Sequence, residues 1–325
     1  MHGRTGCGAL SGQGRLIPAQ AVVSLGLDAH GLLRAWVLDG GWLALPVAAV
    51  VLWGLWRARR LGVRLGLAVL LAGDLLFAWA RFAEPNLLRV RHTALSGTGG
   101  DARIALIGDP HVGLFKGANF LERVVERTNA EHPDAVLIAG DLTYQPQGQS
   151  LDALLAPLAR LEAQTYAVLG NHDQGKPGPD IDRALRQALA RHGVQVIEGR
   201  ALPFKGFTLA GLGDRWAGKD NARFLDALPA DRPLLVLAHN PDSADRLRSR
   251  PHLLVLAGHT HGGQLRIPWL YRRVLPVEHG FDQGEQTYAG PQGRIRVYTT
   301  GGVGESGLPL RLFNPPTIDL LELSP

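Results

Sequence analysis

The amino-acid sequence predicts an α/β fold that follows an apolar N-terminal region. Two observations support this prediction. After residue 100, short apolar runs typical of buried strands alternate with stretches of helical periodicity. Before that point, two long apolar runs follow each other closely and carry few charges. Because alternating strands and helices pack as helices on a sheet, we expect a central sheet in the larger, C-terminal part of the chain.

Five apolar runs are the expected strands of that sheet. They cover residues 103–108, 134–140, 164–170, 233–239 and 252–259. Each is short, and each ends in polar residues, as buried strands do. Helical stretches separate several of these runs. The clearest of them are 119–132 and 150–163.

The apolar N-terminal region predicts a hydrophobic helical hairpin over residues 35–82. The first run, 36–56, is almost free of charge and long enough to cross the hydrocarbon layer of a membrane. The second run, 61–80, is interrupted by Arg64 and Asp74 and is the weaker candidate. We therefore expect membrane-anchoring helices in this part of the chain.

Tryptophans gather in and around the two apolar runs, which fits the aromatic belts of membrane helices. They are Trp36, Trp42, Trp53, Trp56 and Trp79. One alternative is a soluble helical hairpin with a tryptophan-rich core. A second alternative is a twin-arginine export signal, because Arg59 and Arg60 precede an apolar run.

The composition divides the chain near residue 100. Residues 1–34 are rich in glycine and small side chains and stay unassigned. Residues 83–100 end in a glycine-rich stretch and are expected to form a linker or an entering edge strand. Residues 101–325 are expected to form the large α/β domain.

Composition also limits the chemistry. Cys7 is the only cysteine, so neither an intrachain disulfide nor a thiolate zinc site can form. Any metal must therefore be held by His, Asp, Asn or Glu.

The net charge of +5 is concentrated in part before residue 92, and no nucleic-acid reading motif occurs. We expect no nucleic-acid partner.

Each expected strand ends in side chains that bind metals. These are Asp109, His111, Asp141, Asn171, His172, His239, His259 and His261. Ligands of open α/β sheets collect outside the carboxyl ends of strands, so the side chains are expected to converge. His259 and His261 are two residues apart, so on an extended segment both rings would point to one side. Nitrogen and oxygen ligands in this number suit two ions of Mn, Fe or Zn.

Five motifs resemble, in their order and spacing, those of the calcineurin-like metallophosphoesterases. They are GDPHVG (108–113), AGDLT (139–143), GNHD (170–173), LAHNPD (237–242) and AGHTHGGQ (257–264). The resemblance runs from about residue 101 to the C-terminus, and its last part resembles the membrane-associated bacterial branch of the family. It implies a four-layer αββα sandwich, the metallophosphoesterase domain, behind the hydrophobic hairpin.

The resemblance implies two metal sites that share one bridging carboxylate, Asp141. The remaining ligands would be Asp109, His111 and His261 for one ion, and Asn171, His239 and His259 for the other. His172 matches a histidine that is no ligand and that assists the leaving group or steadies the phosphoryl charge. Two divalent ions would lower the pKa of a shared water, and the resulting hydroxide would attack the phosphorus in line.

Several further residues have weaker signals. Asp173 is expected either to hold the ring of His172 or to act as a turn residue, and Asp214 is a candidate for the cleft wall. The glycines of 301–304 favour a backbone that passes close to the metal centre. Arg311 is expected on the solvated surface or, as the alternative, on a substrate phosphate.

The expected function is a membrane-anchored phosphoesterase of the bacterial inner membrane. Its substrate would be a phosphate ester or a pyrophosphate, with a lipid-linked one favoured because the hairpin would hold the cleft near the bilayer. A nucleotide or a soluble phosphodiester is the alternative substrate. A catalytically inactive membrane scaffold is the alternative from another class, and the complete ligand set argues against it.

Overall fold

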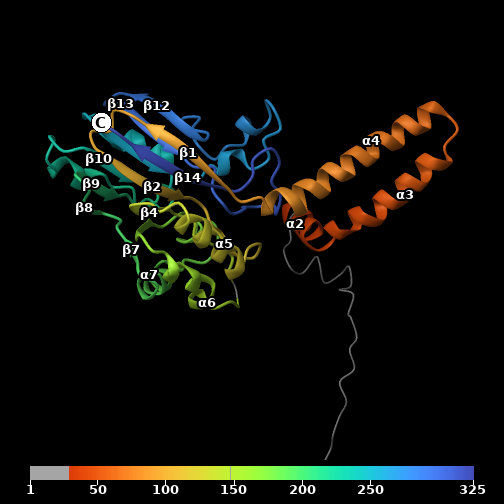
Figure 1. Cartoon of the computed structure of the whole chain (residues 1–325), viewed down its shortest axis with the longest axis horizontal. Helices are drawn as coiled ribbons and strands as arrows, with labels where there is room; N and C mark the ends of the chain where they lie inside the picture. The colour runs from red at the N-terminus through yellow and green to blue at the C-terminus, as the bar shows by residue number, and fades with distance from the viewer. Residues whose placement is uncertain (1–28, 147) are drawn as a thin grey trace, which may run out of the picture.

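The computed structural model describes residues 29–146 and 148–325, and its centre is a pair of six-stranded sheets packed face to face (Figure 1). In spatial order, the first sheet holds β1 (Arg89–Leu95), β14 (Thr317–Leu323), β2 (Ala102–Ile107), β4 (Ala135–Ala139), β6 (Gln164–Val168) and β7 (Val194–Val196). The second holds β12 (Gly284–Gly290), β13 (Gly293–Thr299), β11 (Leu253–Ala257), β10 (Leu234–Leu237), β9 (Phe207–Gly211) and β8 (Arg200–Phe204). Two short strands, β3 (Val112–Gly113) and β5 (Thr143–Tyr144), pair separately.

The strands that end in the candidate ligands run parallel within each sheet. β2, β4 and β6 are parallel neighbours in the first sheet, and β10 and β11 are parallel neighbours in the second. The single central sheet expected from the apolar runs is therefore wrong, because these five strands divide between two sheets. The sandwich implied by the family resemblance is confirmed.

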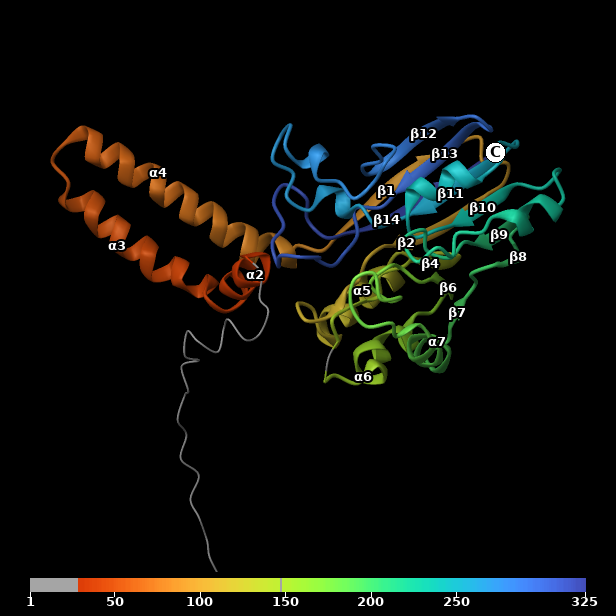
Figure 2. The same ribbon diagram turned by 180° about the vertical axis from the view of Figure 1, so that it is seen from behind.

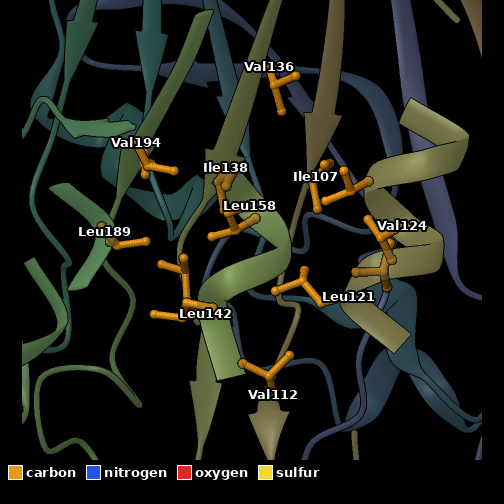
Figure 3. Close-up of a cluster of buried hydrophobic side chains, with 14 of the residues drawn as sticks. Ile107, Val112, Leu121, Val124, Val136, Ile138, Leu142, Leu158, Leu189 and Val194 are labelled. Carbon is orange, nitrogen blue, oxygen red and sulfur yellow. The ribbon is translucent and has the colours of Figure 1, made fainter. Parts of the chain in front are cut away.

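Alternation along the strands makes one core on each face of the first sheet. Ile104 and Leu106 of β2 point into the core between the two sheets, whereas Ala105 and Ile107 point into the outer core under the helices. Figure 3 shows Ile107 in this outer core, opposite Leu121 and Val124. Every side chain of β4 is buried, as expected for a strand that is covered on both faces.

Three helices cover the outer face of the first sheet: α5 (Ala118–Asn129), α6 (Leu151–Leu155) and α7 (Asp182–Arg191). The helix expected at 150–163 is shorter than predicted. It continues as a 3-10 helix, Ala156–Arg160, because Pro157 lacks the backbone N–H that an α-helix needs there.

On the outer face of the second sheet, the layer consists of short 3-10 helices and loops. Among the described residues, these are η5 (Arg223–Ala227) and η6 (Pro241–Arg246), which contribute to a third apolar cluster. The four layers are therefore unequal, since α-helices cover one sheet and short segments cover the other.

The N-terminal elements are α2 (Ala29–Asp39), η1 (Gly41–Leu43), α3 (Ala44–Arg57), α4 (Leu61–Ala78), η2 (Trp79–Ala83) and η3 (Glu84–Asn86). The single span expected at 36–56 is wrong, because Asp39 ends one helix and two glycines follow it. Glycine disfavours helix by about 1 kcal/mol relative to alanine. Within the described residues, one continuous helical stretch, Leu61–Asn86, is long and apolar enough to cross a membrane. The unassigned segment 1–34 lies mostly outside the described residues.

Helices α3 and α4 form an antiparallel hairpin that projects from the sandwich (Figures 1 and 2). Its tryptophans face solvent: Trp42, Trp53 and Trp56 are 63%, 60% and 77% exposed. A soluble hairpin with a tryptophan-rich core is therefore wrong for these residues. No residue of α4 is buried, so most of its apolar side chains face solvent.

The base of the hairpin is fixed to the sandwich. Val37 and Ala80 pack on Leu310 and Leu312 in a small apolar cluster. The backbone N–H of Arg311 donates to the Ala80 carbonyl at 2.9 Å. These contacts join the hairpin to the C-terminal segment that also reaches the candidate site.

Strand β1, which lies in the region expected as a linker or entering strand, pairs in parallel with β14 over its whole length. The Arg91 guanidinium donates to the Asp319 carboxylate at 2.6 Å, and Asp319 is fully buried. Without β1, this carboxylate would lose its charged partner and β14 would become a bare edge.

We predict that a truncated chain starting at Ala83 folds and that one starting at Gly99 is strongly destabilised. Loss of a partner from a buried ion pair costs about 3–5 kcal/mol, which lowers the melting temperature of a domain this size by roughly 10 °C. Thermal unfolding followed by circular dichroism measures the difference. Equal melting temperatures for the two chains would show that β1 contributes nothing to the fold.

Candidate metal centre

The side chains expected to bind metals converge where the two sheets meet at their carboxyl ends. Asp109 and His111 follow β2, Asp141 follows β4, Asn171 and His172 follow β6, His239 follows β10, and His259 and His261 follow β11. Three groups of three have ligand atoms within 4.8 Å of one another: a first group of Asp109, His111 and His261, a second group of Asp141, His239 and His259, and a third set of His111, Asp141 and His172. Every member of these groups is buried except His172, which is partly buried.

The first group is held around two stacked imidazoles. His111 Nε2 lies 3.1 Å from His261 Nε2, and the rings are 4.9 Å apart. Asp141 Oδ2 lies 3.5 Å from His111 Nε2. The two ring nitrogens therefore face the same small space as the bridging candidate.

The second group lies on the other side of Asp141. His239 Nε2 is 3.0 Å from Asn171 Oδ1, 3.0 Å from His259 Nδ1 and 3.4 Å from Asp141 Oδ2. Asn171 thus lies with the histidines it was predicted to join. Because one oxygen of Asp141 is close to a histidine of each group, its carboxylate lies where a bridging ligand would lie.

His259 and His261 do not share one group, as an extended segment would have required. His261 begins a 3-10 turn, and Gly262 has a φ of 55°. The chain therefore turns between the two histidines and sends one ring to each group.

The backbone is strained where these ligands leave their strands. Five of the predicted ligands have positive φ: Asp109 (52°), His111 (47°), Asp141 (49°), His259 (71°) and His261 (50°). Such a conformation costs a non-glycine residue about 1–3 kcal/mol and tends to occur at functional sites. The sharp turns aim the side chains inward, toward one another.

Glycines let neighbouring backbone pass next to the two carboxylates. A Cβ at Gly302 would lie 3.0 Å from Asp109 Oδ2, and one at Gly258 would lie 2.9 Å from the same atom. A Cβ at Gly170 would overlap Asp141 Oδ1. The prediction that the glycines of 301–304 allow a close approach is confirmed.

Hydrogen bonds orient the imidazoles of His239 and His259 and leave one nitrogen of each ring facing the centre. His239 Nδ1 lies 2.8 Å from the Ala139 carbonyl, and His259 Nε2 lies 3.0 Å from the Pro276 carbonyl. These carbonyls can only accept, so each ring donates outward and its other nitrogen faces the centre. Carbonyl groups commonly orient metal-binding histidines in this way.

Burial controls the charge of the centre. It lowers the pKa of His111 and of His259 to about 3, so both rings are neutral at physiological pH. It raises the pKa of Asp109 to about 7. Burial would also lower the pKa of His239, but Asp141 and Asp109 outweigh it and hold that pKa well above its usual value. Metal ions bind neutral imidazoles and ionised carboxylates. The centre combines both kinds of group, so it suits divalent cations.

His172 lies beside the first group. Its ring packs edge-on against Tyr144 and His111, with centroids 5.0 and 5.1 Å away. Its Nε2 lies 3.4 Å from Ser306 Oγ, and its backbone N–H donates to Asp141 Oδ1 at 2.9 Å. Burial lowers the pKa of the imidazole. Ser306 was not predicted from the sequence, because it follows no motif.

Asp173 does not hold the His172 ring. Its carboxylate accepts from the backbone of Leu142, Thr143 and Gly170 at 3.0–3.1 Å and from the Thr143 hydroxyl at 2.8 Å. It therefore joins the loop after β4 to the loop after β6. The turn-residue alternative is the correct one.

Arg311 is neither a surface residue nor free to bind phosphate. It is fully buried and donates to the carbonyls of Gly301, Gly302, Gly304 and Asn314. The Gly304 carbonyl also accepts from His261 Nδ1 at 3.3 Å. Arg311 thus holds the loop that contacts a candidate ligand.

The centre forms the floor of a cavity of about 590 Å³. Asp141, Asn171, His172, His259 and His261 contribute the polar floor, and Leu265, Ile267, Leu270, Val274, Leu308 and Trp216 contribute apolar walls. The Trp216 ring packs edge-on against His259 at 4.7 Å. These wall residues were not predicted, because none belongs to a ligand motif. Asp214 was expected near the cleft wall but does not line the cavity. It accepts from the Ala217 N–H at 2.7 Å instead.

We predict that Arg311→Lys weakens metal binding, because lysine cannot hold four carbonyls in the same geometry. Loss of a group that orients a metal ligand typically costs about 10–100-fold in affinity. Metal titration by calorimetry measures the effect, and Arg294→Lys, at an exposed position of β13, is the matched control. Unchanged affinity in Arg311→Lys would mean that the loop needs no such support.

Comparisons with known proteins agree with this geometry. The family model for calcineurin-like phosphoesterase matches residues 102–263. The chain is 34% identical over 257 residues to phosphodiesterase YaeI of Escherichia coli (strain K12), covering 76% of this chain and 92% of that protein. It is 28% identical to the metallophosphoesterase YkuE of Bacillus subtilis (strain 168), covering 76% and 89%. It is also 31% identical to a Danio rerio transmembrane protein with metallophosphoesterase domain, covering 65% and 50%. The chain therefore belongs to the calcineurin-like phosphoesterases, metal-dependent hydrolases of phosphoesters.

Proposed function

We propose that the protein is a membrane-anchored phosphoesterase with two metal ions, and that it hydrolyses a lipid-linked phosphodiester or pyrophosphate. One observation carries the proposal. Asp141 Oδ2 lies close to a histidine of each ligand group, and this centre lies at the floor of a cavity whose walls are apolar. A charged floor suits a phosphate group, and apolar walls suit the hydrocarbon attached to it.

Two divalent ions, of Mn, Fe or Zn, fit the donor set. Asp109, His111 and His261 would hold one ion, Asn171, His239 and His259 would hold the other, and Asp141 would bridge them. His111 Nε2 lies 3.1 Å from His261 Nε2 and 3.5 Å from Asp141 Oδ2, so two ring nitrogens and a carboxylate oxygen face one small buried space, as the donors of a metal ion would. Bound ions would neutralise phosphate oxygens and lower the pKa of a water molecule.

His172 is proposed to act on the leaving group. Its ring lines the cavity beside His111 and Asp141 and is only partly buried, whereas the other histidines of the centre are buried. The hydroxyl of Ser306 lies 3.4 Å from His172 Nε2 and would orient the ring by a hydrogen bond. A proton donated to the departing oxygen typically accelerates such a reaction by about 10² to 10⁴.

The hairpin is proposed as the membrane anchor. Trp42 and Trp79 lie near its base, and Trp53 and Trp56 lie near its tip. From Trp42 to Trp56 an α-helix rises roughly 21 Å, less than the hydrocarbon core of about 30 Å, whereas the stretch Leu61–Asn86 is long enough to cross it. The apolar surface between these tryptophans is exposed, as a lipid-facing surface would be.

Basic residues at the hairpin tip favour one orientation. Arg57, Arg59, Arg60 and Arg64 lie at or beside the turn between α3 and α4. The positive-inside rule would place this tip in the cytoplasm of a bacterial cell. Because both ends of a hairpin lie on one side, the catalytic domain would then lie outside the inner membrane.

A soluble phosphodiester or nucleotide is the alternative substrate. The relative YaeI is named a phosphodiesterase, which supports hydrolysis of a phosphodiester here. The name does not say which groups the phosphate joins. The apolar walls favour the lipid-linked class over the soluble one. An inactive scaffold would have no need for a complete and strained ligand set, so we do not favour it.

We predict that Asp141→Asn and His172→Ala fail in different ways. Asp141→Asn removes charge shared by both groups, so metal content should fall and all phosphoester hydrolysis with it. His172→Ala should keep nearly the wild-type metal content. It should lose about 10² to 10⁴ in rate with an alkyl phosphodiester and much less with an aryl one, because an aryl leaving group needs little protonation. Metal analysis beside rates for both substrates tests this division.

Three outcomes would count against the assigned roles. Metal loss in His172→Ala would make His172 a ligand or a structural residue. Equal slowing of both substrates would make it a phosphate-binding group. Full metal content in Asp141→Asn would exclude a bridging role for Asp141.

We predict that the full chain fractionates with membranes, whereas the chain starting at Ala83 is released from them. Both should hydrolyse a soluble aryl phosphodiester, since the ligands lie after residue 100. A lipid-linked phosphodiester in vesicles should be hydrolysed faster by the full chain. Recovery of the full chain in the soluble fraction would contradict the proposed membrane anchor. Equal rates of the two chains on the vesicle substrate would favour a soluble substrate over a lipid-linked one.

A further inference from the structure

The segment 267–274, with the sequence IPWLYRRV, presents a mixture of apolar and basic side chains to solvent. The exposed fractions are 38% for Ile267, 79% for Trp269, 46% for Leu270 and 68% for Val274. The value for Trp269 is the largest among the exposed large apolar side chains that the structure describes. Such a group is costly in water unless something covers it.

This exposure belongs to a supported loop. Tyr271 is buried beneath the segment, and its hydroxyl donates to Asp282 Oδ2 at 2.9 Å. The Arg266 guanidinium binds the same carboxylate at 2.6 and 3.0 Å and lies 4.3 Å from the Tyr271 ring centre. The Leu270 N–H donates to the Ile267 carbonyl at 3.1 Å. The segment is therefore held in place while its apolar side chains point outward.

The charges of the segment suit an anionic surface. Arg272 and Arg273 are both exposed and adjoin the apolar side chains. Within the part of the chain that the structure describes, no carboxylate forms an ion pair with either guanidinium. Tryptophan and aliphatic side chains beside arginine are typical of segments that lie in the headgroup region of a membrane.

The position of the segment links it to the hairpin. Leu265, which precedes it, and Leu308 pack in the same apolar cluster as Phe77 and Ala80 at the hairpin base. Figures 1 and 2 both show the loop before β12 on the side of the sandwich from which α3 and α4 extend. A bilayer that receives the hairpin would therefore lie next to this loop.

We propose that the segment 267–274 is a second membrane contact, which rests on the anionic lipid surface into which the hairpin inserts. The proposal builds on the proposed membrane anchor. Ile267, Leu270 and Val274 also line the cavity over the metal centre. Contact between the segment and lipid would open the cavity mouth at the bilayer surface, so an acyl chain could reach the centre without crossing water.

A second copy of the chain is a less suitable occupant of this surface. Most homodimers are symmetric, so the same patch of both copies would meet. Arg272 and Arg273 of one copy would then approach the same arginines of the other, and like charges repel. A lipid surface with anionic headgroups has no such conflict.

A site-specific fluorophore tests the contact in the full chain. Cys7 is first changed to serine, and a single cysteine is introduced by Trp269→Cys, Val69→Cys or Arg248→Cys and labelled with an environment-sensitive dye. Val69 lies on α4 and is 73% exposed, so it reports insertion of the hairpin. Arg248 has a side chain that is 77% exposed and precedes β11, at the end of the sheet opposite the metal centre. Each protein is placed as a single copy in nanodiscs of phosphatidylethanolamine and phosphatidylglycerol.

The expected result is a blue-shifted emission at positions 269 and 69, quenched by lipids that carry a nitroxide, with a water-like and unquenched emission at 248. Quenching at 69 without quenching at 269 would overturn the docking segment and leave the anchor intact. No quenching at either position would contradict both the proposed membrane anchor and the proposed second contact. A shift at 269 that appears only when several copies share a vesicle would assign the surface to self-association.

The Trp269→Ser variant adds a kinetic measurement, because Trp269 does not line the cavity. Hydrolysis of a soluble aryl phosphodiester should keep its wild-type kcat and KM. Hydrolysis of a lipid-linked phosphodiester in vesicles should show a several-fold higher apparent KM. An unchanged KM in vesicles would contradict a role in docking. If the enzyme proves not to act on lipids, the quenching experiment still decides the docking question.

Discussion

Two carboxylates, Asp109 and Asp141, lie inside the protein at the place where the carboxyl ends of both sheets meet, and most of the site depends on this buried negative charge. Burial opposes ionisation of each carboxylate, so positive charge must lie nearby. The surrounding histidines are mostly neutral, which leaves that role to cations. The strained turns and the closely packed glycines around the two carboxylates follow from bringing so many ligands to one point.

The same requirement connects the metal centre to the hairpin. Asp109 touches the glycine loop 301–304, and Arg311 holds that loop through its carbonyls. The backbone of Arg311 in turn binds Ala80, at the end of the hairpin. The base of the proposed anchor and a candidate ligand, His261, are therefore separated by one buried arginine and one loop.

The cavity combines two surfaces of different origin. Its floor comes from loops that follow buried strands, and its apolar walls come largely from the segment after His261. Tyr271, Arg266 and Asp282 support that segment from below, and its Pro276 carbonyl lies 3.0 Å from His259 Nε2. Ligand chemistry and access to the site are thus built by separate parts of the chain, and the second part faces the side where the hairpin leaves.

The sequence by itself determined the ligand types, their order along the chain and their positions after apolar strands. These features are local, since a buried strand and the polar residue at its end are read from a few neighbouring positions. The family resemblance added the sandwich and an expected division of the candidate ligands between two ions. Only the tertiary structure decided the arrangement around them. It divided five expected strands between two sheets, formed the turn that points His259 and His261 in different directions, and buried Arg311. It also brought residues 267–274 beside the hairpin. These outcomes depend on contacts between residues 30 to 230 positions apart, such as Asp173 with Thr143 and Glu84 with Asn314, and local patterns carry no information on such contacts.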